Sequence, residues 1–112
     1  MELAHRDLFP GALEMMVLQT LRRAPRHGYA LAQYIKATSR DFLQIEEGSL
    51  YPALQRMLKA GWIDFEWGTS PRNRKVRIYR ITRAGRKRLE SEISSFDQML
   101  QGIARVMRPI RS

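Results

Sequence analysis

Apolar residues recur at helical spacing in two segments of the first forty residues. The first segment follows Pro10, a residue that suits the first turn of a helix, and it ends at Ala24-Pro25, because proline disfavours helical geometry in the residue before it. The second begins near His27-Gly28 and closes over residues 38–41. The positions expected to face inward are Leu13, Met16, Val17, Thr20 and Leu21 in the first helix, and Leu31, Ala32 and Ile35 in the second.

A third amphipathic segment spans about Gly48 to Ala60. Gly61 follows it and is typical of the left-handed residue that ends a helix. Pro52 is expected near the first turn of this helix, since a proline well inside would remove a hydrogen bond and break it. The apolar stripe consists of Leu50, Leu54, Met57 and Leu58, and it leaves the opposite side of the helix polar.

After Gly61 the pattern changes from a helical period to alternation. Residues 62–67 alternate as a half-buried strand does, so Phe65 and Trp67 are expected to be buried on its inner side. Residues 68–73 have the composition of a turn, and Val76–Ile81 is rich in residues that favour strands. The pattern predicts a β-hairpin.

The last segment predicts one long helix. Thr82 is a suitable N-cap, and nothing interrupts the helical pattern until Pro109, so the helix is expected to reach about Met107. Its apolar residues are spaced as in a heptad repeat, which favours packing against another helix, and a second copy of the chain is the commonest source of one. The alternative is that part of the stripe folds back on the first helix of the same subunit. The predicted dimer seam consists of Leu89, Ile93, Phe96, Leu100, Ile103 and Met107.

Three helices, a hairpin and a long final helix predict a mostly α protein with a small β-hairpin (α+β). The order is that of a winged helix-turn-helix followed by a dimerisation helix. Residues 1–82 are expected to form the winged helix-turn-helix domain and residues 83–112 the C-terminal dimerisation helix, as one continuous structural unit.

Charge indicates the kind of partner. Twenty basic residues against eleven acidic ones give a formal net charge of +9, and sixteen of the twenty are arginine. The guanidinium group suits phosphate and guanine edges, so a nucleic acid is the leading partner. Nine of the cations lie between Arg72 and Arg88, a stretch that contains no acid, and such a block favours a polyanion that would neutralise it.

Four strings of residues follow one another in register along the chain: His27-Gly28-Tyr29-Ala30-Leu31, Gly48-Ser49-Leu50-Tyr51-Pro52-Ala53-Leu54, Gly61-Trp62-Ile63 and Tyr79-Arg80-Ile81-Thr82-Arg83-Ala84-Gly85. They give the chain a resemblance to the PadR family of transcriptional regulators, in its short subclass with a single C-terminal helix. The resemblance implies a homodimeric winged-helix protein that binds double-stranded DNA, in many members a repressor released by a small molecule.

Two sets of residues are expected to contact DNA. The polar side of the third helix suits the major groove, where arginine reads guanine and glutamine reads adenine, although an ordinary solvated face has the same pattern. The hairpin turn is expected to place arginine in a minor groove or on phosphates. The first set is Ser49, Tyr51, Pro52, Gln55, Arg56 and Lys59; the second is Arg72, Asn73, Arg74, Lys75 and Arg77.

A small apolar or aromatic ligand is the third partner that the resemblance implies, bound between the first and last helices of the dimer. Methionines suit ligands of loosely specified shape, yet methionine at helical spacing is more often plain core. The candidate pocket residues are Met15, Met16, Phe96, Met99 and Leu100.

Other functions are disfavoured. The chain has no cysteine, and His5 and His27 belong to no metal-ligand or triad spacing, so we expect no enzyme, catalytic residue, metal or cofactor. No apolar run has the length of a membrane span and no signal peptide is evident, which predicts a cytoplasmic protein without membrane contact. An RNA-binding or ribosome-associated winged helix and a protein-interaction module are the alternatives.

Overall fold

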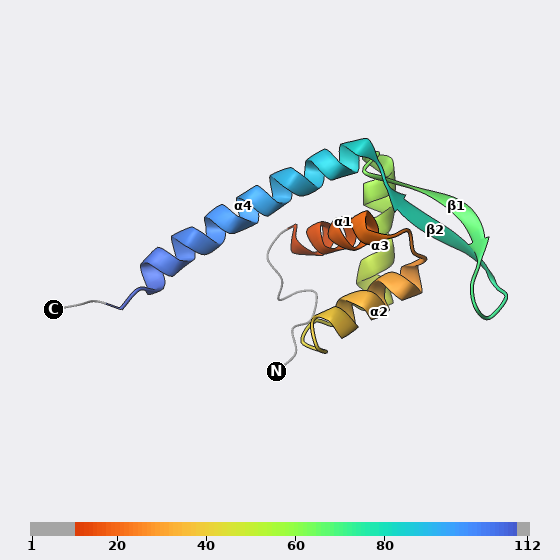
Figure 1. Cartoon of the computed structure of the whole chain (residues 1–112), viewed down its shortest axis with the longest axis horizontal. Coiled ribbons are helices and arrows are strands. Elements are labelled where there is room, and N and C mark those ends of the chain that lie inside the picture. The colour runs from red at the N-terminus through yellow and green to blue at the C-terminus, as the bar shows by residue number, and fades with distance from the viewer. Residues whose placement is uncertain (1–10, 110–112) are drawn as a thin grey trace.

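A computed structural model describes residues 11–109, and these residues form a winged helix with a long terminal helix (Figure 1). The expected fold class is confirmed. The parts of the two predicted domain ranges at residues 1–10 and 110–112, Pro10 included, lie outside the described residues. The elements are α1 (Ala12–Arg23), α2 (Gly28–Thr38), α3 (Glu47–Lys59), β1 (Ile63–Thr69), β2 (Lys75–Ile81) and α4 (Arg83–Met107).

The first three helices and the base of the hairpin enclose one core, and α4 runs away from this body as a rod (Figure 1). The hairpin extends from the other side of the body, so the molecule is elongated, with extents of 64, 31 and 21 Å. Each helix contributes leucines to the core that are almost completely buried: Leu13 and Leu18 from α1, Leu31 from α2, Leu50 and Leu54 from α3, and Leu89 from α4.

The helix ends follow the sequence signals. His27 Nδ1 accepts a hydrogen bond from the Ala30 amide at 3.3 Å and so caps α2. Thr82 caps α4 in the same way, because its Oγ1 accepts from the Gly85 amide at 3.0 Å. The Thr82 hydroxyl also donates to the Gly61 carbonyl at 2.6 Å, at the point where Gly61 has a φ of 78°. These contacts fix α4 to the end of α3.

The prediction for Pro52 was wrong by one turn. Helix α3 begins at Glu47, so Pro52 is its sixth residue and lies inside the helix. The chain tolerates it because the preceding turn is already closed by the Ser49 and Leu50 amides, which both donate to the Glu46 carbonyl at 3.0 and 2.9 Å. The proline costs the helix one hydrogen bond, because residue 52 has no amide N–H to donate to the Gly48 carbonyl four positions earlier.

The two strands pair antiparallel from Ile63↔Ile81 to Thr69↔Lys75. The predicted burial of Trp67 was wrong: this side chain is 55% exposed. It lies on the same side of the strand as the buried Ile63, as the alternation predicts, but the hairpin has left the body of the molecule by that point. Alternation identifies a side of a strand and does not tell how far the core extends beneath it.

Candidate nucleic-acid interface

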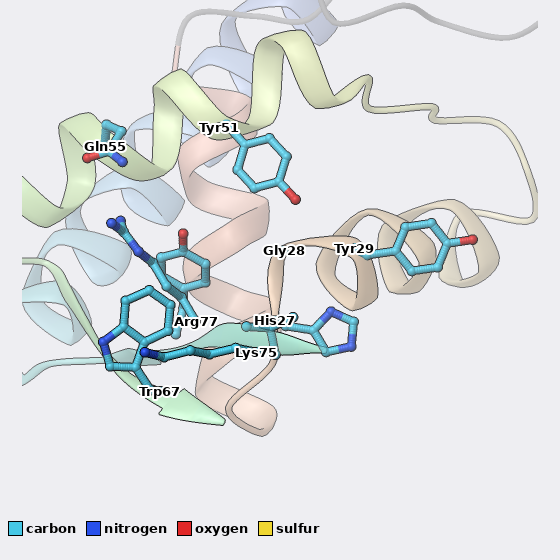
Figure 2. A pocket seen from close by; sticks show the side chains of 10 residues that line it. His27, Gly28, Tyr29, Tyr51, Gln55, Trp67, Lys75 and Arg77 are labelled. Atoms are coloured by element: carbon cyan, nitrogen blue, oxygen red, sulfur yellow. The ribbon is translucent and has the colours of Figure 1, made fainter. Parts of the chain in front are cut away.

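A cleft of about 380 Å³ lies between α3, the hairpin and the beginning of α2 (Figure 2). Tyr51 and Gln55 enter it from α3, while Lys75 and Arg77 enter from β2 on the opposite side. Predicted helix and wing residues therefore share one concave surface. Six further lining residues were not predicted to belong to it: His27, Gly28, Tyr29, Trp67, Val76 and Tyr79.

The exposed side of α3 faces two different neighbours. Tyr51 and Gln55, one turn apart, face the cleft. Arg56 is rotated by about 100° from Gln55 and lies on the α1 side, where its guanidinium donates to Glu14 Oε1 at 2.9 Å. The predicted base-reading pair, Gln55 and Arg56, is thus divided, and the charge of Arg56 is partly offset. Of the remaining predicted residues, Pro52 and Lys59 are exposed and Ser49 is half-buried.

Tyr51 is held in a fixed place at the cleft wall. Its ring packs so closely over Gly28 that a Cβ at that glycine would lie 3.0 Å from the ring. Partial burial, with smaller contributions from the negative charge of Glu47 and from the neighbouring Tyr79 phenol, raises the pKa of the Tyr51 phenol above its usual value. The hydroxyl therefore stays protonated at neutral pH and can donate a hydrogen bond to an anionic oxygen.

The two sides of the hairpin differ in charge. On the outer side Arg80 lies 3.0 Å from Asp64 Oδ1 and 3.6 Å from Glu66 Oε2. The strand register places Lys75 and Arg77 on the opposite side of β2 from Arg80. Among the described residues, neither of them has a carboxylate within salt-bridge distance. The inner side, which borders the cleft, is therefore the positive one.

A second hollow, about 530 Å³, lies next to the cleft between α2 and the hairpin turn. Tyr29 and Gln33 line it on the helix side, and Arg72 and Arg74 on the turn side. The turn is closed by the Ser70 and Arg74 backbones, since the Ser70 amide donates to the Arg74 carbonyl at 2.8 Å. Asn73 has a φ of 60° there, a conformation that asparagine tolerates better than most residues.

The predicted dimer seam on α4 is exposed along most of its length. Leu89 is the exception, because it is completely buried in the core of its own subunit and is not available to a partner. Phe96 is half-buried. The seam's exposed side chains are Ile93 at 42%, Leu100 at 43%, Ile103 at 42% and Met107 at 73%, and Val106 at 84% adds to the apolar surface beside them.

The candidate ligand residues do not form one pocket. Met15, Phe96 and Met99 meet at a hollow of about 100 Å³ between α1 and α4. Met16 faces another hollow, of about 200 Å³, beside α2, because adjacent helical residues point about 100° apart. Leu100 is exposed on α4 and lines neither hollow.

Nothing in the described residues points to a metal centre or a membrane span. No group of three or more histidine, aspartate and glutamate side chains there is arranged to hold a metal ion. None of the described helices combines the length and apolar character needed to cross a bilayer.

The fold and the positive cleft define a winged-helix DNA-binding protein, and comparison with known proteins gives its family. The profile of the "Transcriptional regulator PadR-like family" matches residues 17–91, more than half of the chain. The chain belongs to this family of transcriptional regulators, which bind DNA.

Solved structures agree. A PadR-like transcriptional regulator from Bacillus cereus is 27% identical with a TM-score of 0.75, covering 89% of this chain and 95% of that one. A PadR-family regulator from Eggerthella lenta is also 27% identical, with a TM-score of 0.77 and coverage of 89% and 85%. A transcriptional regulator from Clostridium thermocellum has a TM-score of 0.81 over 88% of this chain and 95% of that one; its 23% identity shows the fold alone.

The unequal sides of the hairpin predict unequal effects of two arginines on one strand. Arg77→Gln should weaken duplex binding several-fold and lower the salt slope by about one per subunit, because the cleft loses a cation that has no carboxylate partner among the described residues. Arg80→Gln removes the same charge three residues away, but from a group already offset by Asp64 and Glu66. Titration of duplex DNA at several salt concentrations compares them. Equal losses would contradict the assignment of the inner side.

Proposed function

We propose that the protein is a homodimeric repressor that binds a near-palindromic operator in double-stranded DNA. The observation that carries this proposal is the cleft, in which Gln55 of α3 and two cations of the hairpin face the same space. A helix that enters the major groove beside a positively charged wing needs this arrangement. Tyr51, whose hydroxyl remains a donor, adds a contact for a phosphate.

The dimer is supported by α4. Exposed apolar side chains follow one side of this helix over its last four turns, and a helix of 25 residues extends about 37 Å. Such a stripe is costly to leave in water, and a second α4 would cover it. A symmetric pair presents two α3 helices to two half-sites, so the operator should be close to palindromic, with half-sites about one helical turn (~34 Å) apart.

The ligand that would release DNA is proposed to bind at the hollow that Met15, Phe96 and Met99 line between α1 and α4. At about 100 Å³ the hollow in one subunit is small, and a second α4 would both enclose and extend it. Its two methionines and Phe96 favour an apolar ligand, since thioether side chains adapt to such surfaces, while Glu92 and Ser95 line the same hollow as polar residues. Because Met16 lies elsewhere, this site is smaller than the sequence predicts.

The experiment is titration of the purified chain with a palindromic duplex from the region upstream of its own gene. A scrambled duplex and an RNA of equal length serve as competitors. We expect the palindrome to bind most tightly, with two subunits on each duplex. Tighter binding of the RNA would replace this proposal with RNA recognition. The comparison is needed because Trp67, Tyr29 and Tyr51 all expose ring surface, on which the bases of a single strand could stack.

The residue that reads bases is tested within the same assay. Gln55→Ala should cost about 1–3 kcal/mol on the operator at each half-site and little on the scrambled duplex, because a lost base contact reduces discrimination. Lys59→Ala, at the end of α3 and exposed, is the comparison expected to weaken both duplexes alike. Equal losses on both duplexes for Gln55→Ala would remove it from base reading.

A further inference from the structure

The two cations of the inner hairpin face are held by aromatic rings. Lys75 Nζ lies 4.5 Å from the centroid of the Trp67 ring. Arg77 Cζ lies 4.5 Å from the Phe65 ring and 5.6 Å from the Trp67 ring. In the sheet register Trp67 is directly opposite Arg77, and Lys75 pairs with Thr69 one step further on the same side. Trp67 is thus the residue that contacts both cations.

An aromatic ring and a carboxylate order a cation in different ways. A carboxylate, such as the two beside Arg80, fixes a guanidinium and at the same time cancels its charge. A ring face attracts the cation through its quadrupole and carries no net charge. Lys75 and Arg77 are therefore restrained without losing the charge that a polyanion would meet.

The Trp67 ring is itself fixed. It packs edge-to-face on Phe65, with centroids 5.5 Å apart and planes at 85°. Phe65 in turn packs on Tyr79, which is buried at the base of the hairpin. The row of rings therefore connects the core to the exposed end of the cleft. This row gives a physical reason for a tryptophan to remain 55% exposed at a position where the core no longer reaches.

We propose that Trp67 is a positioning residue for DNA binding, which holds Lys75 and Arg77 in the cleft so that both meet phosphates of the duplex. The inference rests on the proposed function, because it concerns the same cleft. Trp67 and Lys75 lie together on one wall of it, across from Tyr51 and Gln55 (Figure 2). Order established before binding reduces the entropy that two long side chains lose on the DNA.

The test is a double-mutant cycle on duplex binding by the whole chain. Trp67→Leu removes the ring and keeps apolar bulk, and it should weaken binding about three- to tenfold, as expected from two exposed cation–π contacts. Trp67→Phe, which retains a smaller ring, should recover part of the loss. In a Lys75→Gln/Arg77→Gln background, Trp67→Leu should have almost no further effect, since nothing remains for the ring to position.

Each outcome has a meaning. The same loss in both backgrounds would show that Trp67 touches DNA itself and would overturn the positioning role, as would no loss in either. If Trp67→Leu does not fold, Trp67→Phe completes the cycle. Thermal unfolding and sedimentation of each variant identify losses due to folding or assembly.

A second measurement separates this inference from the proposed function. In the free protein the Trp67 ring current should shift the Lys75 Cε protons upfield in the NMR spectrum, and Trp67→Leu should return them to the ordinary position. If wild-type protein binds the duplex and this shift is absent, the proposed function stands and the positioning role is overturned. If wild-type protein binds no duplex at all, the proposed function fails first, and the positioning role fails with it.

Discussion

Replacing both Leu100 and Ile103 with glutamate should convert the protein to monomers and lower its affinity for a palindromic operator by about 10²–10⁴-fold. Both side chains lie on the exposed apolar stripe of α4, each about two-fifths exposed. In a symmetric dimer each change occurs twice, and a charge would be buried where an apolar side chain had been. The loss on DNA follows because the second half-site is no longer linked to the first.

The control for this experiment is Ser94→Glu. Ser94 is exposed on the same helix, about 140° around it from the stripe, so it adds an acid without touching the seam. Sedimentation should report dimers for the control and monomers for the double variant at micromolar concentration. Dimers in both would place the interface elsewhere on the chain, and monomers in the control would mean that charge alone disrupts assembly.

Gly85→Ala should destabilise the fold by about 3 kcal/mol, although alanine is the better helix former. Gly85 lies in the first turn of α4, where a Cβ would come within 2.0 Å of the Trp62 carbonyl oxygen and 2.9 Å of Ile81 Cγ1. The carbonyl is backbone and already accepts from the Thr82 amide, so it has little freedom to move. The gain in helix propensity, about 1 kcal/mol, is smaller than this clash.

Gly102→Ala is the matched control, since it makes the same change in the same helix with open space around the new Cβ. It should stabilise the protein by about 0.5–1 kcal/mol. Thermal unfolding of both variants at one protein concentration gives the comparison. A Gly85→Ala variant as stable as the wild type would mean that the start of α4 is less closely packed on Trp62 and Ile81 than the structure shows.

Local signals in the sequence predicted most of the fold. The helix start near His27-Gly28, the N-cap at Thr82 and the stop at Gly61 depend on a few consecutive residues, and the structure confirms all three. The extent of α4 to Met107 follows from an uninterrupted helical pattern, and it is also confirmed. Boundaries of this kind are readable because neighbouring residues alone determine them.

The candidate site was predictable only in part, because some of its contacts join distant segments. Arg56 pairs with Glu14, 42 positions away, and the spacing of residues along the chain does not predict a pair between such distant positions. Leu89 has the same spacing as the rest of the seam, but whether a stripe is covered by its own subunit depends on where α1 packs. Met15 and Met16 look equivalent in sequence and face different hollows. Lys75 and Arg77 were predicted to belong to the wing because a run of basic residues can be recognised from the sequence alone, before the fold is known.

The unequal charge of the two hairpin sides has a consequence for the speed of association. Long-range attraction between a protein and a polyanion raises encounter rates, yet a uniformly basic projection would attract DNA equally in every orientation. Since Arg80 is offset on the outer side, the field of the hairpin is strongest on the side of the cleft. For the proposed complex we therefore expect collisions that begin with α3 turned toward the duplex to be favoured over reversed ones, so that fewer encounters need reorientation before they become productive.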